Sequence, residues 1–515
     1  MSGSTLVWVL LAFAAYMCFM LVIGALFMKK TKSSEDFFLG GRGLNGWVAA
    51  LSAQASDMSG WLLMGLPGAV YAFGTGQAWI AVGLFLGTVF NWICISGRLR
   101  RYTIVADNSL TLPAFFENRF KDERKILLGV SSVVIVIFFL VYTASALAAG
   151  GKLFNTVFGF DYRMSLTLGA VVILAYTFMG GFMAVCTTDF VQGMLMLVAL
   201  MIVPILAYFL IPGGLTDALV SSGVDSASYM SLFQSGGEPY SAIDIISQLA
   251  WGLGYCGMPH ILTRFMAVKD QKELNKSKKI AIIWVAISLF FGVAIGVIGR
   301  AYLLPTILGS DGAGSTETVF IAMITKVFTE DIRLPFIGGL FLCGILAAIM
   351  STADSQLLVA SSSVAEDIYK QIFNPDVDQK KVLRISRITV IVVAVLAYLI
   401  ALDPNSSIMG LVSNAWAGLG SAFGPIVLMS LFWKRTNFYG AVTGIISGGL
   451  TVIVWDYLPL VGGETLGTVT GLYSLLVGFI LSVIVIVVVS LCTKEPSQEI
   501  LDEFELVASG KDIQE

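Results

Sequence analysis

The sequence predicts an all-α polytopic membrane protein with thirteen transmembrane helices and a core of two inverted repeats. Three observations carry this prediction. Hydrophobic residues make up 57% of the chain and charged residues only 13%, against roughly 45–50% and about 25% in soluble domains. Apolar runs of about 18 residues or more, long enough to span a bilayer, recur from end to end. Two of these runs, five spans apart, are interrupted in the same way.

The apolar runs are placed by hydropathy and by the loops that separate them. The first run lacks the basic region of a cleavable signal peptide and is long enough to span, so we expect it to remain as a helix. The predicted spans lie near residues 5–28, 45–73, 76–97, 126–150, 164–181, 187–211, 241–267, 279–304, 334–362, 383–402, 408–433, 438–458 and 468–492.

The order of these spans predicts six segments. Spans 2–6 and spans 7–11 form two repeats of opposite direction, and the other spans flank them. The segments are 1–44, the first helix with a cytoplasmic loop; 45–212, the first repeat; 213–240, an extracellular loop; 241–435, the second repeat; 436–492, spans 12 and 13; and 493–515, an acidic cytoplasmic tail.

Positive charge is distributed unevenly between the two sides of the membrane. When loops are assigned to alternate sides, all but five of the 31 lysines and arginines fall on one side. Because positively charged loops stay in the cytoplasm, the N-terminus is predicted outside and the C-terminus inside. The outer loops 212–240 and 305–333 and the tail after Lys494 are polar and acidic, so we expect solvated appendages there. The five exceptions are Lys152, Arg163, Arg300, Lys326 and Arg333.

Two spans carry clusters of helix-weakening residues at similar depths. Span 2 has a weak stretch from Ala55 to Gly60, and span 7 reads WGLGYCGMP from Trp251 to Pro259. Glycine and proline weaken or kink a helix. Matched interruptions in oppositely directed helices are typical of inverted-repeat transporters, whose site lies between the broken helices. The alternative is that glycine, present 53 times, is common in membrane helices because it lets them pack closely.

The break in span 2 predicts a cation site. Unwound carbonyl oxygens suit a hard cation such as sodium, and Ala348, Ser351 and Thr352 of span 9 offer a carbonyl and two hydroxyls on one helix face. These hydroxyls could instead bond only to their own helix. Asp57, within the break, is a functional candidate because a charge at the bilayer centre costs roughly 2.5–3.5 kcal/mol. Its alternative is a structural pairing with a hydroxyl or an arginine.

Four other charged residues have simpler interpretations. Asp189 is expected to cap the sixth helix, with Gln192, three residues later, supplying the reciprocal hydrogen bond of a capping box. Asp354 lies near the inner end of span 9, either as a solvated helix-end charge or as a ligand. Asp456 is expected at the membrane interface. Arg42 is expected in a cytoplasmic loop, where a basic residue needs no special explanation.

Aromatic residues at the two breaks predict the solute site. Trp61, Trp251 and Tyr255 flank the breaks and Tyr142 lies within span 4, so they could enclose a small apolar ring. Ordinary helix packing is the alternative, above all for Tyr142. His260, the single histidine, is expected to support the helix bend by hydrogen bonding. No nucleophile and histidine grouping can be assembled around it, which argues against an enzyme.

Five pieces of the sequence resemble the solute:sodium symporter family, and most of all its bacterial proline carriers. The pieces are FFLGGRGLNGW, SAQASDMSGWLLMGLPG, VCTTDFVQGM, WGLGYCGMPH and ILAAIMSTADSQLL, in this order. The resemblance runs from about residue 5 to residue 492. It implies thirteen helices, a LeuT-like five-plus-five inverted-repeat core with discontinuous helices, and alternating access.

The resemblance also implies which residues act. The sodium ligands of the family match the carbonyls of Ala55, Met58 and Ala348 and the hydroxyls of Ser351 and Thr352. Asp57 matches an acid needed for sodium coupling, and Asp189 matches one thought to assist ion movement. The proline-binding positions match Ser59, Trp61, Tyr142, Trp251, Tyr255 and Pro259.

The function expected from both lines of argument is import of L-proline coupled to sodium entry, in the cell membrane and without catalysis. Proline, sodium and the lipid bilayer are the expected partners, and no nucleic acid is expected. A sodium-coupled carrier of another small solute and a transporter-like membrane sensor are the alternatives. The sequence does not predict the oligomeric state.

Overall fold

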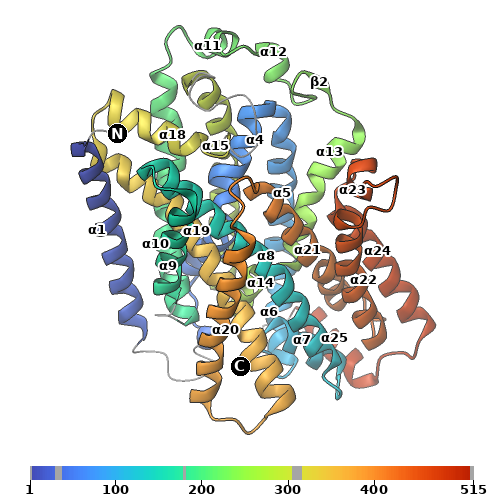
Figure 1. The fold of residues 1–515 in the computed structure, drawn as a ribbon. Helices are drawn as coiled ribbons and strands as arrows, with labels where there is room; N and C mark the ends of the chain where they lie inside the picture. The colour runs from blue at the N-terminus through green and yellow to red at the C-terminus, as the bar shows by residue number, and fades with distance from the viewer. Residues whose placement is uncertain (1–2, 29–37, 178–180, 304–315, 511–515) are drawn as a thin grey trace.

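The computed structural model describes residues 3–28, 38–177, 181–303 and 316–510, and within them long helices run side by side as one bundle (Figure 1). α1 (Gly3–Met28) lies on one flank, and α22 (Phe438–Tyr457) and α24 (Ser474–Cys492) lie on the other. α19 (Pro335–Ser362) and α21 (Ile408–Phe432) are central, since 83% of their most apolar windows is buried, against 28% for α1.

Ten helices among the described residues are long and apolar enough to cross a membrane. They correspond to all the predicted spans except 2, 5 and 7, where the helices are short or broken. The all-α membrane fold is therefore confirmed. The count of thirteen transmembrane helices stays a prediction. Besides the five helices already given, the long spans are Thr75–Val105 (α5, Ala78–Phe90, and α6, Ser96–Val105), α8 (Ile126–Phe158), α10 (Phe182–Phe209), α15 (Gln271–Leu303) and α20 (Gln379–Ile400); α19 continues as a π-helix to Phe373.

Span 2 is broken at Met58. α3 (Gly46–Asp57) begins at Asn45, whose side chain accepts hydrogen bonds from two backbone N–H groups of the first turn. Met58 N still donates to Gln54 O at 2.9 Å, so the helix continues past Ala55, and the break is shorter than the predicted stretch. The Met58 ψ of 77° then leaves the helical range. The chain resumes as a π-helical turn (Trp61–Gly65) and α4 (Leu66–Phe73).

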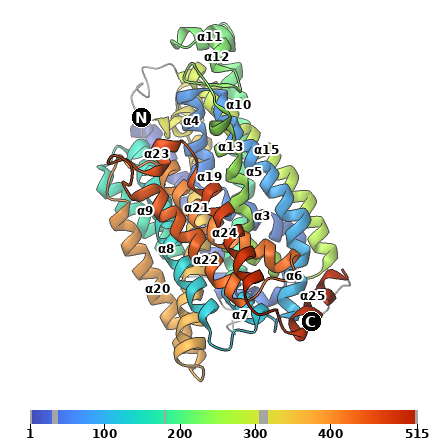
Figure 2. The same ribbon diagram turned by 90° about the vertical axis from the view of Figure 1, so that its right-hand side faces the viewer.

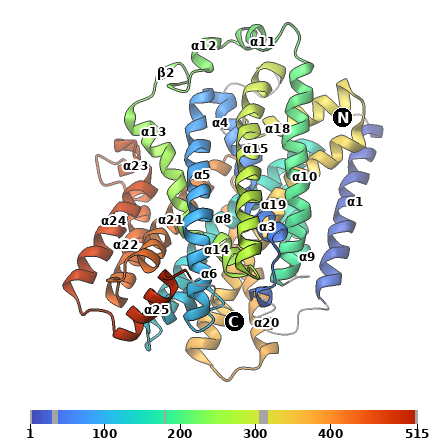
Figure 3. The same cartoon turned by 180° about the vertical axis from the view of Figure 1, so that it is seen from behind.

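Span 7 is broken over the predicted stretch. α13 (Ala242–Leu249) changes into a tighter 3₁₀ helix at Ala250–Gly257. Met258 is extended, and α14 (Pro259–Met266) begins with proline at its first position, where the missing N–H costs nothing. Figure 2, from the side, shows α3 near α15, against which it packs, and Figure 3, from behind, shows α3 and α14 among the central helices. α9 (Tyr162–Thr177), in the place of span 5, packs against α8.

The two outer loops are not simple appendages, contrary to expectation. The first contains α11 (Leu215–Ser221), α12 (Ser226–Tyr229) and a hairpin of β1 (Gln234–Ser235) and β2 (Glu238–Pro239), paired with Gln234 opposite Pro239. The buried Tyr229 donates its hydroxyl to the carbonyl of Val70 at 2.8 Å, so this loop covers the end of α4. In the second, α18 (Val319–Thr325) is buried through its apolar residues; residues 304–315 lie outside the described part.

The acidic tail also packs, which corrects the expectation of a solvated segment for its helix α25 (Gln498–Ala508). Apolar residues at helical spacing, Ile500, Phe504 and Val507, are buried. The guanidinium of Arg98 lies 5.0 Å from the ring centroid of Phe504, and Lys121 Nζ lies 2.6 Å from Glu503 Oε1. Residues 511–515 lie outside the described part.

The backbone of span 7 lies directly against α5. A Cβ added at Gly252 would lie 2.2 Å from the carbonyl oxygen of Gly83, and one at Gly87 would lie 2.2 Å from the carbonyl oxygen of Gly252. Both neighbours are backbone atoms, which cannot swing away. Glycine is required here because the two backbones approach closely. The glycines of span 7 therefore serve both purposes: they let helices pack closely, and they lie where the helix is interrupted.

We therefore expect Gly252→Ala to lower stability by about 1–3 kcal/mol, since the overpacked Cβ forces α5 and the 3₁₀ segment apart. The measurement is the midpoint of thermal unfolding in detergent, followed by tryptophan fluorescence. Gly129→Ala is the control, because a Cβ there would meet only the end of the Ile372 side chain at 3.5 Å. Equal midpoints for the two variants would contradict the close-approach argument.

Candidate functional site

A hydrogen bond joins the two broken helices at their breaks. The hydroxyl of Tyr255, in the 3₁₀ segment, donates to Asp57 Oδ2 at 2.5 Å, and both residues are buried. The indole N–H of Trp61 donates to the backbone carbonyl of Asp57 at 2.9 Å, which folds the ring back over the break. Asp57 Oδ1 is buried and has no hydrogen-bond partner among the described residues. The Oδ1 atom of this carboxylate can therefore accept a hydrogen bond from a ligand or coordinate a cation.

The predicted cation ligands converge between α3 and α19. Ser351 Oγ lies 2.8 Å from the carbonyl oxygen of Ala55 and 3.2 Å from that of Ala348. The break makes the first carbonyl available, because Ser59 N donates to Asp57 O at 2.9 Å instead of back to Ala55 in the helical pattern. The hydroxyl of Ser351 thus bridges two helices, and the interpretation that it bonds only to its own helix is wrong.

The other two predicted ligands lie beside this bridge in the chain. Thr352 Oγ1 is buried with no hydrogen-bond partner among the described residues. Met58 is fully buried and is the residue at which the helix ends. The ligand set is all oxygen, and two of its atoms already touch the Ser351 hydroxyl, so the chemistry fits a hard cation such as sodium. Within the described residues, no group of three or more His, Cys, Asp and Glu could hold a metal.

Three predicted solute residues gather around Asp57. Tyr142, on α8, is fully buried and lies near both Asp57 and Ser59. Tyr255 closes the opposite side through its bond to the carboxylate. Trp61 is buried over the break. A small solute at this point would meet hydroxyls, a carboxylate and aromatic edges together.

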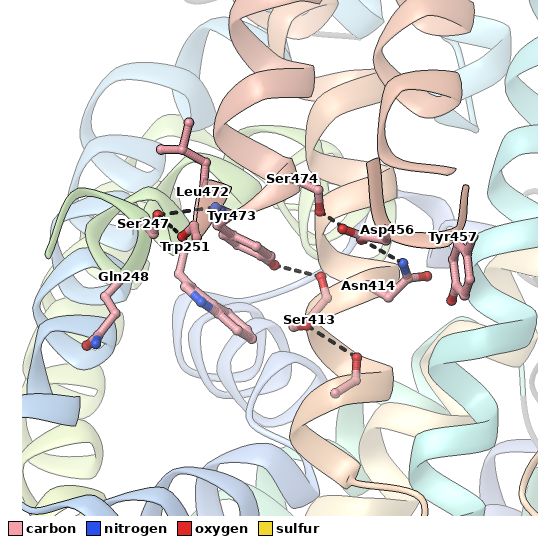
Figure 4. A pocket seen from close by; sticks show the side chains of 12 residues that line it. Ser247, Gln248, Trp251, Ser413, Asn414, Asp456, Tyr457, Leu472, Tyr473 and Ser474 are labelled. Atoms are coloured by element: carbon pink, nitrogen blue, oxygen red, sulfur yellow. Dashed lines mark hydrogen bonds between the residues drawn. The ribbon is translucent and has the colours of Figure 1, made fainter. Parts of the chain in front are cut away.

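Pro259 and Trp251 lie away from this cluster. Pro259 begins α14 and lines a separate small cavity with Phe182 and Leu358, so its part is to set the geometry of the break. Trp251 lies one turn before Tyr255, and its ring stacks on Tyr473 of the segment leading into α24, with centroids 5.2 Å apart and an interplanar angle of 21° (Figure 4).

This ring pair lines a cleft of about 430 Å³ between α13, α21, α22 and α24 (Figure 4). The cleft contains Asp456, whose Oδ2 accepts hydrogen bonds from Asn414 Nδ2 at 3.0 Å and from Ser474 Oγ at 2.9 Å. Sequence reasoning placed Asp456 at the membrane interface and did not connect it with Trp251.

Asp189 does not cap its helix. α10 begins seven residues earlier, at Phe182, because the predicted start of span 6 was too late. The carboxylate is fully buried, with Oδ2 at 3.2 Å from an Arg264 guanidinium nitrogen, and it accepts a hydrogen bond from Ser52 Oγ at 2.7 Å. The expected partner Gln192 instead donates to the hydroxyl of Tyr16 at 3.0 Å.

Arg264 is the main residue that sequence reasoning missed. Besides Asp189, it donates to Ser355 Oγ on α19 at 2.6 Å, to Ser52 Oγ on α3 at 3.1 Å and to the carbonyl of His260 at 2.7 Å. It therefore ties α3, α10, α14 and α19 together. A signal for this role was present in the sequence, because Arg264 lies inside the predicted span 7 (residues 241–267). The charge count instead assigned this arginine to the cytoplasmic loop that follows.

Three further expectations need correction. Arg42 is buried and donates to the carbonyl of Met266 at 2.7 Å and to Asn108 Oδ1 at 2.8 Å, so it is a structural link. Asp354 is fully buried, which excludes a solvated helix end. Neither ring nitrogen of His260 has a hydrogen-bond partner among the described residues; the ring packs edge-on between aromatic neighbours, including Tyr142.

A second buried ion pair was also missed. Lys152 Nζ, on α8, lies 2.6 Å from Glu317 Oε2, and Glu317 Oε1 accepts a hydrogen bond from Ser407 Oγ at 2.9 Å, just before α21. Lys152 was one of the basic residues on the unfavoured side of the membrane. A basic residue that breaks the charge pattern is a signal for a buried partner.

Comparisons with known proteins identify the family of this chain. The model of the sodium:solute symporter family matches residues 37–448. The osmoregulated proline transporter OpuE of Bacillus subtilis (strain 168) is 43% identical over 490 residues, 95% of this chain and 96% of that protein. The sodium/proline symporter of Staphylococcus aureus is 43% identical over 488 residues, 94% of this chain and 92% of that protein.

A solved structure supports the fold. A Na⁺-coupled sialic acid symporter in a substrate-bound outward-open state matches with a TM-score of 0.76 at 20% identity, over 95% of this chain and 98% of that one. Two oppositely directed broken helices joined at their breaks define an inverted-repeat, LeuT-like membrane transporter rather than an enzyme. The chain belongs to the sodium:solute symporter family.

The buried Arg264 gives a stability prediction. We expect Arg264→Met to destabilise the protein by about 3–5 kcal/mol, because Asp189 is left buried and unpaired. The double variant Arg264→Met with Asp189→Asn should recover much of that loss, since no uncompensated charge remains. Thermal unfolding in detergent measures both.

Lys121→Met is the matched control for a lost positive charge. Its ion pair with Glu503 is partly exposed, so the loss should stay below about 1 kcal/mol. A double variant no more stable than Arg264→Met alone would mean that the uncompensated carboxylate is not the cause.

Proposed function

We propose that this chain imports L-proline together with sodium across the cell membrane by alternating access. One observation carries the proposal. Tyr255 in span 7 bonds to Asp57 in span 2, and Ser351 on α19 bonds to the carbonyl of Ala55 in span 2. The predicted ion and solute positions therefore share one buried region. The relatives named as proline transporters support the choice of solute, because they align over nearly the whole chain.

We assign the sodium ion, as co-transported substrate, to the carbonyls and hydroxyls between α3 and α19. Ser351 donates its proton toward Ala55 O and Ala348 O. An arriving cation would turn that proton away and take the hydroxyl oxygen as a ligand. Asp57 supplies the nearby negative charge, and Asp189, fixed by Arg264, serves ion movement. The assigned ligands are Ala55, Met58, Ala348, Ser351 and Thr352.

We assign proline to the space beside the ion. The protonated imino group would face Asp57 Oδ1, which has no partner among the described residues, and the pyrrolidine ring would lie against aromatic edges. Coupling follows because each bound species orders the break in span 2 for the other, and joint occupancy favours the inward-facing state. We assign Ser59, Trp61, Tyr142 and Tyr255 to contact with the solute. Trp251 is assigned to the layer that closes this space from the outer cleft, and Pro259 to the geometry of the break.

The sodium gradient provides enough free energy. One ion that crosses about 100 mV down a tenfold gradient releases roughly 2.3 plus 1.4 kcal/mol, which supports several-hundred-fold accumulation of solute. A carrier of another small solute would share the cation site and would have different solute-contacting side chains around Tyr142. A transporter-like sensor would bind the same ligands without sustained flux.

We expect Asp57→Ala to abolish the sodium stimulation of proline uptake into proteoliposomes, because the cation then lacks its nearest full charge. Tyr255→Phe removes only the hydroxyl, so it should raise the proline concentration for half-saturation and keep the sodium dependence. Radiolabelled proline uptake with and without a sodium gradient measures both. Unchanged sodium dependence in Asp57→Ala would remove this residue from the mechanism.

The orientation is tested separately. With the N-terminus outside and the C-terminus in the cytoplasm, cysteines placed at Asn108 and at Ser231 should react with an impermeant thiol reagent from opposite faces of the membrane. Intact cells and inverted vesicles supply the two faces, and the chain with its own cysteines alone gives the background. Labelling of both positions from one face would refute the orientation.

A further inference from the structure

The cleft beside Trp251 has the size of a small-molecule site. Its volume of about 430 Å³ falls within the roughly 300–1,000 Å³ of ligand pockets and greatly exceeds the share of about 30 Å³ for one water. It therefore has room for an organic molecule with some of its hydration. Its polar and aromatic lining includes Ser247, Trp251, Ser413, Asn414, Tyr457 and Tyr473.

Asp456 is the single charged side chain that lines this cleft within the described residues. Its two hydrogen-bond donors, Asn414 and Ser474, are neutral. No ion pair to Asp456 occurs in the described part of the chain. A half-buried carboxylate that has lost water and gained only neutral partners attracts a cation, and the cleft that Asp456 lines also has aromatic walls.

The floor of the cleft is the stacked pair of Trp251 and Tyr473 (Figure 4). Tyr473 is held by its hydroxyl, which donates to the carbonyl of Ser413 at 2.6 Å. One helical turn after Trp251, Tyr255 bonds to Asp57. The ring pair is therefore the layer between the cleft and the buried region at the two breaks, and its movement would connect them.

We propose that this cleft is an outer binding site for a small zwitterionic amino or imino acid, with the protonated amine on Asp456 and the hydrocarbon part on the aromatic floor. The Asn414 amide, which gives one N–H to Asp456, would donate its second N–H to the carboxylate of the same molecule. The identification of proline as the physiological ligand rests on the proposed function, but binding at the cleft does not depend on sodium, because the assigned sodium ligands lie on α3 and α19.

The test is protection of a cysteine placed in the cleft. Ser413→Cys is reconstituted in phosphatidylglycerol vesicles, which contain no amine, in potassium medium without sodium. Proline should slow its reaction with an impermeant maleimide, while N-acetylproline, which lacks the protonated amine, should not. Asp456→Asn should raise the proline concentration needed for protection by about tenfold or more, since a hydrogen bond to a charged group is lost.

Glu464→Gln is the matched control, because it removes an acid from the loop between α22 and α24 without lining the cleft. It should leave protection unchanged. Equal protection by proline and N-acetylproline, or none by either, would overturn the proposal whether or not Asp456→Asn folds. Protection by sodium chloride alone, or by added phosphatidylethanolamine in place of proline, would show an ion site or a lipid site and overturn it too.

Sodium-driven proline uptake by the unaltered protein is measured in parallel. Absence of uptake would refute the proposed function and leave the cleft to be decided by the protection assay. Normal uptake without protection would refute the outer site alone. The two proposals can therefore fail independently.

Discussion

The hydrogen bond from Tyr255 to Asp57 is the contact on which the site depends. It joins the two points where membrane helices give up their own hydrogen bonding, and each break alone would leave polar backbone in an apolar setting at a cost of several kcal/mol. The Trp61 indole and the Ser351 hydroxyl bond to freed carbonyls of span 2, and Asn91 and Trp416 bond to carbonyls of span 7. The Tyr255 hydroxyl, in turn, bonds to the carboxylate of Asp57. Side chains thus satisfy the broken segments, and the bond between Tyr255 and Asp57 couples the two breaks.

Two fully buried acids are handled in different ways. Asp189 has the guanidinium of Arg264 beside it, and that charge cannot leave. Asp57 has a hydroxyl as its side-chain partner and one oxygen without a partner among the described residues. A permanent counter-charge makes a structural link, while a carboxylate that lacks one is stabilised by whichever cation arrives. This difference explains why Asp57 suits an exchangeable ion, whereas Asp189, which is already paired with Arg264, is assigned to ion movement and not to ion binding.

Much of the fold followed from the sequence, since hydropathy, the positive-inside pattern and the glycine clusters are local signals. The broken spans were predicted in this way, and with them a cation site that joins Ser351 of span 9 to the break in span 2. The hydrogen bond from Ser351 to Ala55 itself was not predicted. Long-range pairings were not, because nothing near Asp189 in the sequence indicates Arg264, and nothing near Asp456 indicates Trp251. The tail helix was also missed, because its apolar residues are few and gain their meaning only against the partner surface that includes Arg98.

The contacts that close the bundle on the two sides of the breaks differ in part in their chemistry. At the end that carries α6 and α14, arginines bind carbonyls and a carboxylate, as in Arg100 with the carbonyl of Val268 at 2.7 Å and Arg264 with Asp189. At the end that carries α13, the stack of Trp251 on Tyr473 closes the layer above the breaks. Aromatic stacks are worth about 0.5–1.5 kcal/mol beyond burial, whereas a charge-assisted bond contributes about 1.5–3 kcal/mol. Parting the rings beside Trp251 therefore breaks no charged bond, and a solute that stacks on the same rings can offset that cost as it enters. The buried pair of Lys152 with Glu317 holds another part of this end closed.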